Sequence, residues 1–205
     1  MYTLGPEFDS ATVTPGTNIL VAGPPLSGKR RLAFEALSRG VETREGSIIV
    51  TTRDSARRVL DTYGSVLASP ESNTVGFVDC VTRHQGRSPS DTSLVKYASS
   101  PVDMTGIGIN FSSFLQEFCT ERELRQNRIV FDSLSTLLMY SDLQTVFRFM
   151  HVFTSRVDDA NAIGLYTIDS TAHDIEAMNT LKQLFDGIVI VEENSDVSIR
   201  LPDAA

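Results

Sequence analysis

The segment "GPPLSGKR", residues 23–30, has residue types and a spacing that suit phosphate binding. Glycines let backbone N–H groups curl around an anion, and a helix that begins near Lys29 would add the positive end of its dipole. The Lys29 ammonium would reach the outer phosphates of a nucleotide. The alternative is a Gly/Pro turn without a ligand. We expect the binding loop to consist of Gly23, Pro24, Pro25, Leu26, Ser27, Gly28, Lys29 and Arg30.

Arg30 departs from the phosphate-binding pattern G-x-x-x-x-G-K-[S/T], which has a hydroxyl residue after the lysine. The hydroxyl of that pattern is a ligand of Mg²⁺. A guanidinium has five N–H donors and no lone pair, so Arg30 cannot ligate a cation. It could contact phosphate oxygens instead, and its charge would repel a metal ion. We therefore expect anion binding with little dependence on Mg²⁺.

Asp132 stands at the end of the apolar run "RIVF". Ligands of open α/β sheets bind beyond the carboxyl ends of the strands, so a carboxylate there is well placed for a site. In P-loop proteins such an aspartate holds Mg²⁺, directly or through water. We predict Asp132 as the metal-binding residue, acting through water. Ser133 and Ser135 are expected to be turn or cap residues.

Short apolar runs such as "SIIV", "RIVF" and "GIVIV" recur along the chain, and their apolar residues are nearly continuous. Such runs are typical of parallel strands that helices cover on both faces. The predicted strands are Asn18–Ala22, Ser47–Thr51, Val75–Val81, Arg128–Asp132, Ile163–Ile168, Gly187–Val191 and Val197–Leu201.

Helical patterns lie between these runs, two of them with apolar stripes at i, i+3, i+4 and i+7. The predicted helices are Lys29–Ser38, Ser55–Tyr63, Phe111–Gln126, Asp142–Asp158 and Asp174–Leu184.

The alternation of strands and helices predicts one α/β domain over residues 1–205, with a doubly wound, mainly parallel sheet. Only the turn "EENSD" separates the last two strands, so they should form an antiparallel C-terminal hairpin. Residues 1–13 are expected to be an N-terminal lead-in. Residues 82–110, rich in Ser, Asp, Gly and Pro, are expected to be a long inserted loop, and loops of this length are usually functional or mobile.

The overall charge argues against some classes of partner. The net charge of −8 opposes a general electrostatic contact with nucleic acid. No apolar run approaches the ~18 residues that a membrane span needs. The first residues, "MYTLGPEFDS", have neither a basic head nor an apolar signal core, so we expect a cytoplasmic protein. Only three of the 18 cationic residues are lysines, and this acidic, lysine-poor composition fits a salt-adapted cytoplasm.

The segments "PGTNILVAGPPLSGK" and "IVFDSLSTLL" resemble the RecA-like P-loop ATPases, and more closely their KaiC-like archaeal branch. "SPVDMTGIGINFSSFLQEF" resembles haloarchaeal RecA/KaiC-like proteins of unassigned function. The resemblance extends from about residue 14 to residue 201. It implies a RecA-like domain that binds ATP between the first strand and the next helix, often at a subunit interface. The implied partners are a second copy in a homo-oligomer or a heteromeric KaiC/RecA-like protein.

The same resemblance assigns two further candidates. "IIVTTRDSARRVL" aligns with the segment where KaiC-like ATPases have paired glutamates, one of them the general base. Arg53 and Asp54 occupy those positions, so Asp54 is the candidate base although its side chain is one methylene shorter. His173 lies near the position where RecA-like proteins have a polar sensor of the γ-phosphate, so it is a candidate phosphate sensor.

From these features we expect an ATP-binding regulatory or signalling protein with weak or absent hydrolysis. It would act through nucleotide-dependent self-association or partner binding. Three alternatives stay open: a slow ATPase that uses Asp54, a recombination-mediator paralogue that acts on DNA, and a scaffold that has lost the nucleotide. Metal-dependent turnover would favour the first, and the acidic charge speaks against the second.

Overall fold

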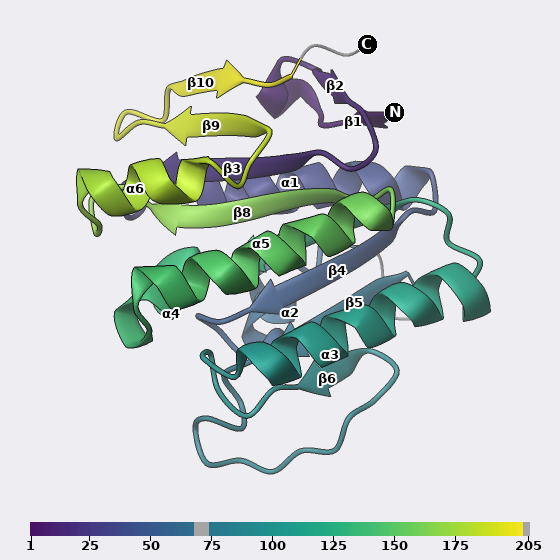
Figure 1. Ribbon diagram of the computed structural model, residues 1–205. Coiled ribbons are helices and arrows are strands. Elements are labelled where there is room, and N and C mark those ends of the chain that lie inside the picture. Colours follow the sequence, from purple (N-terminus) through teal and green to yellow (C-terminus); the bar gives the residue numbers. More distant parts are fainter. Residues whose placement is uncertain (68–73, 203–205) are drawn as a thin grey trace.

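The computed structural model describes residues 1–67 and 74–202. An eight-stranded sheet forms its centre, in the order β10-β9-β3-β8-β7-β4-β5-β6 (Figure 1). Neighbouring strands are parallel except for the antiparallel pair β9 and β10. The mainly parallel sheet and the C-terminal hairpin are therefore confirmed. The strands are β3 (Asn18–Gly23), β4 (Gly46–Thr51), β5 (Val75–Asp79), β6 (Val95–Tyr97), β7 (Asn127–Asp132), β8 (Ile163–Asp169), β9 (Gly187–Val191) and β10 (Val197–Arg200).

Helices cover both faces of the sheet, as a doubly wound topology requires (Figure 1). One face has α1 (Lys29–Glu42) and α2 (Ala56–Tyr63). The other has α3 (Met104–Gln116), α4 (Leu134–Tyr140), α5 (Leu143–Asp159) and α6 (Ile175–Lys182). Within residues 1–67 and 74–202, none of the helices has the length and apolar character needed to cross a membrane.

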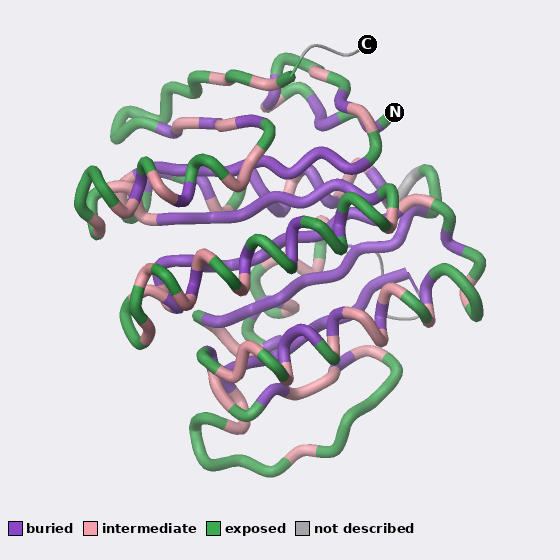
Figure 2. Tube along the Cα trace, in the orientation of Figure 1, coloured by how far each residue is buried: buried purple, intermediate pink, exposed green. Residues whose placement is uncertain are grey.

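Alternate residues of the central strands enter two separate cores. In β4, Ile48 and Val50 pack into the core under α3 and α5, whereas Ile49 packs into the core under α1 and α2. The strands are buried along their length (Figure 2). This burial on both faces explains why their apolar residues are continuous rather than alternating.

The N-terminal lead-in is an integral part of the core. It forms a small antiparallel pair, β1 (Tyr2–Thr3) with β2 (Thr12–Val13), around the short 3-10 helix η1 (Pro6–Phe8). Arg128, at the start of β7, donates 2.9 Å hydrogen bonds to the carbonyl oxygens of Thr3 and Ala36. Its Nε also lies 2.6 Å from Glu45 Oε2, and the pair is buried. Arg128 therefore ties the lead-in to the sheet.

The prediction of one irregular stretch over residues 82–110 is wrong in part, because this range contains β6 and the first half of α3. Two glycines inside "MTGIGIN" lower the helix propensity of that segment, which favoured a loop. Tertiary packing and an N-cap compensate, since Asp103 accepts a 2.8 Å hydrogen bond from the Gly106 N–H.

The predicted helix 111–126 is wrong at both ends. Helix α3 begins at Met104 and gives way to the π-helical turn η3 (Glu117–Glu121). Helix α4 was not predicted, because its seven residues are too few to show a clear period. Helix α5 begins after the N-cap Asp142, which accepts from the Thr145 N–H at 2.9 Å.

Candidate functional site

The predicted phosphate-binding loop connects the buried end of β3 to the start of α1. Two residues adopt left-handed backbone angles, Leu26 with φ 64° and Gly28 with φ 93°, and they turn the chain back toward the helix. Gly23 has no room for a side chain, because a Cβ there would clash with the Val191 carbonyl and lie 2.7 Å from Ser27 Oγ. The tight curl of this loop therefore depends on its glycines.

The interior of the loop has hydrogen-bond donors that the protein does not use. Ser27 donates its backbone N–H to the Pro24 carbonyl at 3.3 Å, which closes the turn. Within the described part of the chain, the N–H groups of Gly28, Lys29 and Arg30 have no acceptor. The Ser27 hydroxyl is buried and also has no partner there. Unmet donors at the start of a 14-residue helix form the arrangement that binds anions.

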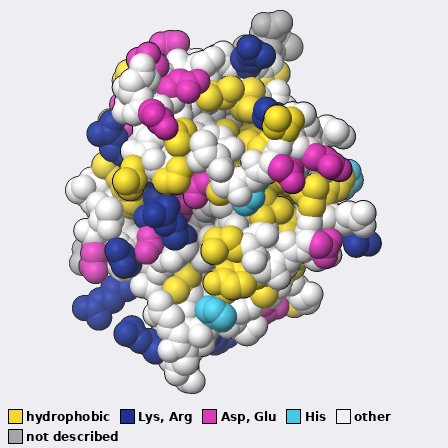
Figure 3. All heavy atoms as spheres, turned by 90° about the vertical axis from the view of Figure 1, so that its left-hand side faces the viewer, with side chains coloured by type: hydrophobic (Ala, Val, Ile, Leu, Met, Phe, Trp, Pro, Cys, Tyr) yellow, Lys and Arg dark blue, Asp and Glu magenta, His cyan; other side chains and the backbone are white. Residues whose placement is uncertain are grey.

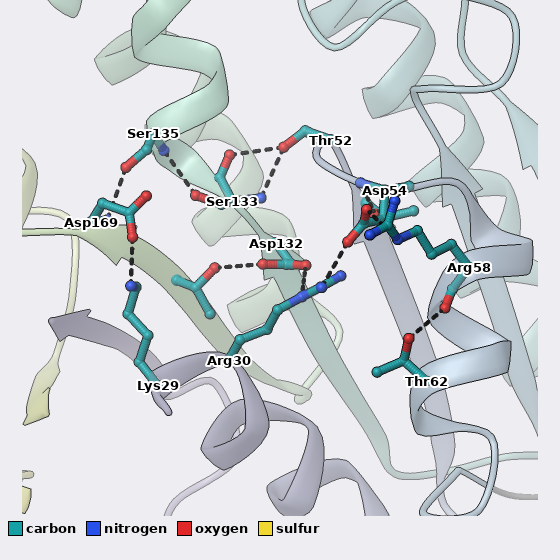
Figure 4. Close-up of polar contacts among 12 residues, drawn as sticks. Lys29, Arg30, Thr52, Asp54, Arg58, Thr62, Asp132, Ser133, Ser135 and Asp169 are labelled. Atoms are coloured by element: carbon teal, nitrogen blue, oxygen red, sulfur yellow. Dashed lines mark hydrogen bonds and ion pairs between the residues drawn. The ribbon is translucent and has the colours of Figure 1, made fainter. Parts of the chain in front are cut away.

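Lys29 is buried and contacts two oxygen atoms, one of them from Asp169 (Figure 4). Its Nζ lies 2.8 Å from the Pro24 carbonyl oxygen and 2.5 Å from Oδ1 of Asp169. Asp169 is the last residue of β8 and pairs in register with Gly23, the last residue of β3. The lysine predicted to bind phosphate is therefore already paired with a carboxylate.

Arg30 forms ion pairs with both predicted acidic residues (Figure 4). Its Nε lies 2.6 Å from Oδ2 of Asp132, and its Nη1 lies 2.7 Å from Oδ2 of Asp54. Burial by itself lowers the pKa of Arg30, but the two carboxylates outweigh this effect and raise the pKa above its usual value. Arg30 is therefore a permanent cation between the ends of β4 and β7.

The aromatic rings of Phe34 and Tyr63 support the guanidinium of Arg30. Its central carbon lies 5.7 Å from the Phe34 ring centre and 5.4 Å from the Tyr63 ring centre. The two rings stack on each other at 4.2 Å. Cation–π contacts of this kind add to the ion pairs and restrict the position of the arginine.

The groups around Asp132 do not fit a magnesium ion of the P-loop kind. Asp132 is 1% exposed, and its Oδ1 accepts a 3.0 Å hydrogen bond from the Thr167 hydroxyl while Oδ2 is paired with Arg30. Position 30 offers no lone pair to a metal. The guanidinium also places a positive charge where the metal would have to sit.

Asp54 contacts a second arginine as well. Its Oδ1 lies 3.3 Å from Nε of Arg58, four residues along the chain. Two arginines, Arg30 and Arg58, thus pair with the Asp54 carboxylate. The role of Asp54 as a general base stays a prediction.

The serines after Asp132 differ in what they contact. Ser133 caps α4, as expected, and its Oγ accepts from the Ser135 N–H at 3.1 Å. Ser135 Oγ accepts from the Asp169 N–H at 2.9 Å and lies 2.8 Å from Nε2 of His173. Burial lowers the pKa of His173, although Asp169 and Asp174 oppose this effect. Ser135 therefore links His173 to Asp169, the partner of Lys29.

Sequence reasoning missed the roles of Asp169 and Ser135. Asp169 ends an apolar strand, the same signal that identified Asp132, and this signal could have identified it. The contacts of Ser135 depend on β7 lying beside β8, which the sequence alone does not reveal.

Comparisons with known proteins agree on the fold. One similar structure is the uncharacterized protein PH0321 from Pyrococcus horikoshii, solved in complex with an unknown peptide. It matches this chain with a TM-score of 0.70 and 14% sequence identity, and the match covers 94% of this chain and 86% of that chain. The KaiC-like protein PH0186 from Pyrococcus horikoshii OT3 has a TM-score of 0.60 and 15% identity, with 94% and 82% covered. At such identities the similarity shows a RecA-like fold and nothing finer.

None of the curated proteins matches this sequence. The model of a protein family described as a family of unknown function, DUF7504, matches residues 16–191. That range includes the phosphate-binding loop, Asp54, Asp132 and Asp169, and it extends from the turn before β3 to the end of β9. The chain therefore belongs to DUF7504, a family of unknown function with a RecA-like fold.

Proposed function

We propose that this protein binds ATP through the loop of residues 23–30 without a metal ion, hydrolyses it weakly or not at all, and uses occupancy of the site to regulate association. The observation that carries the proposal is the double ion pair of Arg30 with Asp132 and Asp54. An arginine held in this way supplies positive charge to a bound phosphate, as a metal ion does in other phosphate sites. It has no lone pair, so it cannot itself ligate a metal ion.

The unmet donors of the loop support the phosphate-binding part of this proposal. The N–H groups without an acceptor and the buried Ser27 hydroxyl lie in the loop that connects β3 to α1. Nη2 of Arg30 is also buried and has no partner among the described residues. Unsatisfied buried donors are costly, and the oxygens of a bound phosphate would satisfy them.

The contacts of Asp54 and Asp132 support weak hydrolysis. Phosphoryl transfer depends on positioning the attacking water and on stabilising the charge that develops on the phosphate oxygens. Here Arg30 engages Asp54, the candidate base, and Asp132, the predicted metal-binding residue. The protein should therefore bind ATP but hydrolyse it weakly or not at all.

Exposed apolar side chains around the site support the association part. Figure 3 looks onto the carboxyl ends of the parallel strands and shows separate hydrophobic groups among charged ones. Large exposed side chains lie in the segments that follow β3, β7 and β8, namely Leu26 (98% exposed), Met139 (73%), Tyr140 (61%) and Ile175 (80%). These side chains lie on the segments beside the proposed ligand site, and we propose that they contact a second copy of this chain.

The proposal is tested by thermal shift with ATP in high-salt buffer containing EDTA. Wild type should gain thermal stability with ATP, and Lys29→Ala should not. The matched control is Arg31→Ala, which removes an exposed cation from the same helical turn and should respond like wild type.

Three outcomes would contradict parts of the proposal. No response by wild type would leave the nucleotide-free scaffold, and rapid phosphate release would show an active ATPase. If the elution volume in size-exclusion chromatography is the same with and without ATP, nucleotide does not control association.

A further inference from the structure

We propose that Asp169 is an internal competitor of phosphate for Lys29, so that the anion must displace a carboxylate of the protein itself before it can bind fully. This inference rests on the proposed function, because it concerns the same loop and the same lysine. The pair places Oδ1 of Asp169 2.5 Å from Lys29 Nζ, and both side chains are largely buried.

The backbone holds Asp169 in the competing position. It ends β8 directly opposite Gly23, and its N–H donates to Ser135 Oγ at 2.9 Å. The next residue, Ser170, donates its N–H to the Gly23 carbonyl, also at 2.9 Å. These contacts attach the Asp169 backbone to the start of the loop, so only rotation of the side chain can take the carboxylate away from the lysine.

A phosphate that contacts Lys29 must therefore lie close to the Asp169 carboxylate. Two like charges that share one cation repel each other, and this repulsion is strong where water is partly excluded. The anion either displaces Asp169 from Lys29 or binds beside it at a cost. In both cases, removal of the Asp169 charge strengthens anion binding.

The pair also stabilises the protein when no anion is bound, because it neutralises a buried ammonium. Loss of the Asp169 charge should therefore lower the melting temperature without ATP and increase the rise that ATP produces. A carboxylate with a merely structural role would lower the melting temperature and leave the ATP-induced rise unchanged or smaller. These opposite changes separate competition from simple structural support.

The test is titration of ATP, in buffer with EDTA, into wild type, Asp169→Asn and Asp174→Asn. Asp169→Asn keeps the size of the side chain and the backbone N–H that Ser135 accepts. We expect it to bind ATP roughly 10-fold more tightly, within the range of couplings between two interacting groups. Asp174→Asn removes the same charge from the same loop but keeps an N-cap for α6, and its affinity should match wild type.

Asp169→Ser is the second variant and should also bind more tightly, which protects the test against a folding defect of one substitution. If wild type binds ATP and both Asp169 variants bind equally or more weakly, the inference is wrong and the proposed function stands. If the Asp169 variants bind ATP and wild type does not, Asp169 competes strongly enough to prevent binding, and the inference is confirmed. If no variant binds ATP, the proposed function fails and the inference fails with it.

Discussion

The Nε atom of Arg30 lies 2.6 Å from Oδ2 of Asp132, a residue 102 positions further along the chain. The contact connects the first turn of α1 to the end of β7, and Asp54 at the end of β4 binds the same guanidinium. Arg30 therefore bridges the two carboxylates. A cation thus lies beside Asp132, the residue that the sequence predicts to hold a metal.

Replacement of Arg30 by threonine should lower the stability of the protein and make it respond to Mg²⁺. Arg30→Thr leaves the buried Asp132 without its cation, so we expect a loss of about 3 kcal/mol in the free energy of unfolding. It also places a hydroxyl directly after Lys29 and removes Arg30 from Asp54 and Asp132. Mg²⁺ should therefore raise the melting temperature of this variant. Urea unfolding and thermal denaturation with and without Mg²⁺ measure the two effects.

Arg31→Thr is the control for this substitution, because Arg31 is exposed on the next position of the same helix. It should lose less than 1 kcal/mol and show no response to Mg²⁺. Stability of Arg30→Thr close to that of wild type would show that the ion pairs of Arg30 contribute little.

The buried pair of Arg128 and Glu45 should be the most sensitive charge pair outside the site. Arg128→Met removes the donors to Thr3, Ala36 and Glu45 and leaves a buried carboxylate unpaired. We expect a loss of about 3–5 kcal/mol in urea unfolding. The double variant Arg128→Met/Glu45→Leu removes the stranded charge, so it should be more stable than the single variant. A double variant less stable than Arg128→Met would contradict this account.

Stability should fall below pH 6.5 partly because of His173. Burial holds its pKa in the folded protein below the value of about 6.5 expected in the unfolded chain. Between these two values the unfolded chain binds more protons, so the free energy of unfolding decreases as the pH falls through this window. His173→Gln cannot titrate, and its melting temperature should fall less than that of wild type between pH 7.5 and 5.5.

His151→Gln serves as the control, since His151 is exposed on α5. It should keep the pH dependence of wild type. An identical pH dependence of His173→Gln and wild type would show that His173 does not couple folding to protonation.

The strands and the strand–loop–helix arrangement around residues 23–30 were predictable because their signals are local. Parallel strands that are buried on both faces need continuous apolar residues, and the loop needs Gly23, Gly28 and Lys29 at fixed spacing. The inability of Arg30 to ligate a metal also followed from its chemistry alone. Its partners did not follow, because the contacts with Asp54 and Asp132 depend on β4 and β7 being neighbours in the sheet.

The main errors arose where tertiary contacts override local preference. Gly106 and Gly108 weaken the helical signal of α3, but Ile107 and Phe111 bury that helix against the sheet. Asp169 was overlooked because nothing in "YTIDSTAHD" shows that its carboxylate meets Lys29. Only the register of β3 with β8 brings the two residues together.

The central claim is that Arg30 replaces a metal in a site that still binds ATP. Isothermal titration of ATP into wild type, once in buffer with EDTA and once with excess Mg²⁺, tests it most directly. We predict binding in both buffers with dissociation constants within about threefold, less than the tenfold change that 1.4 kcal/mol would produce. Binding that requires Mg²⁺, or no binding in either buffer, would contradict the claim.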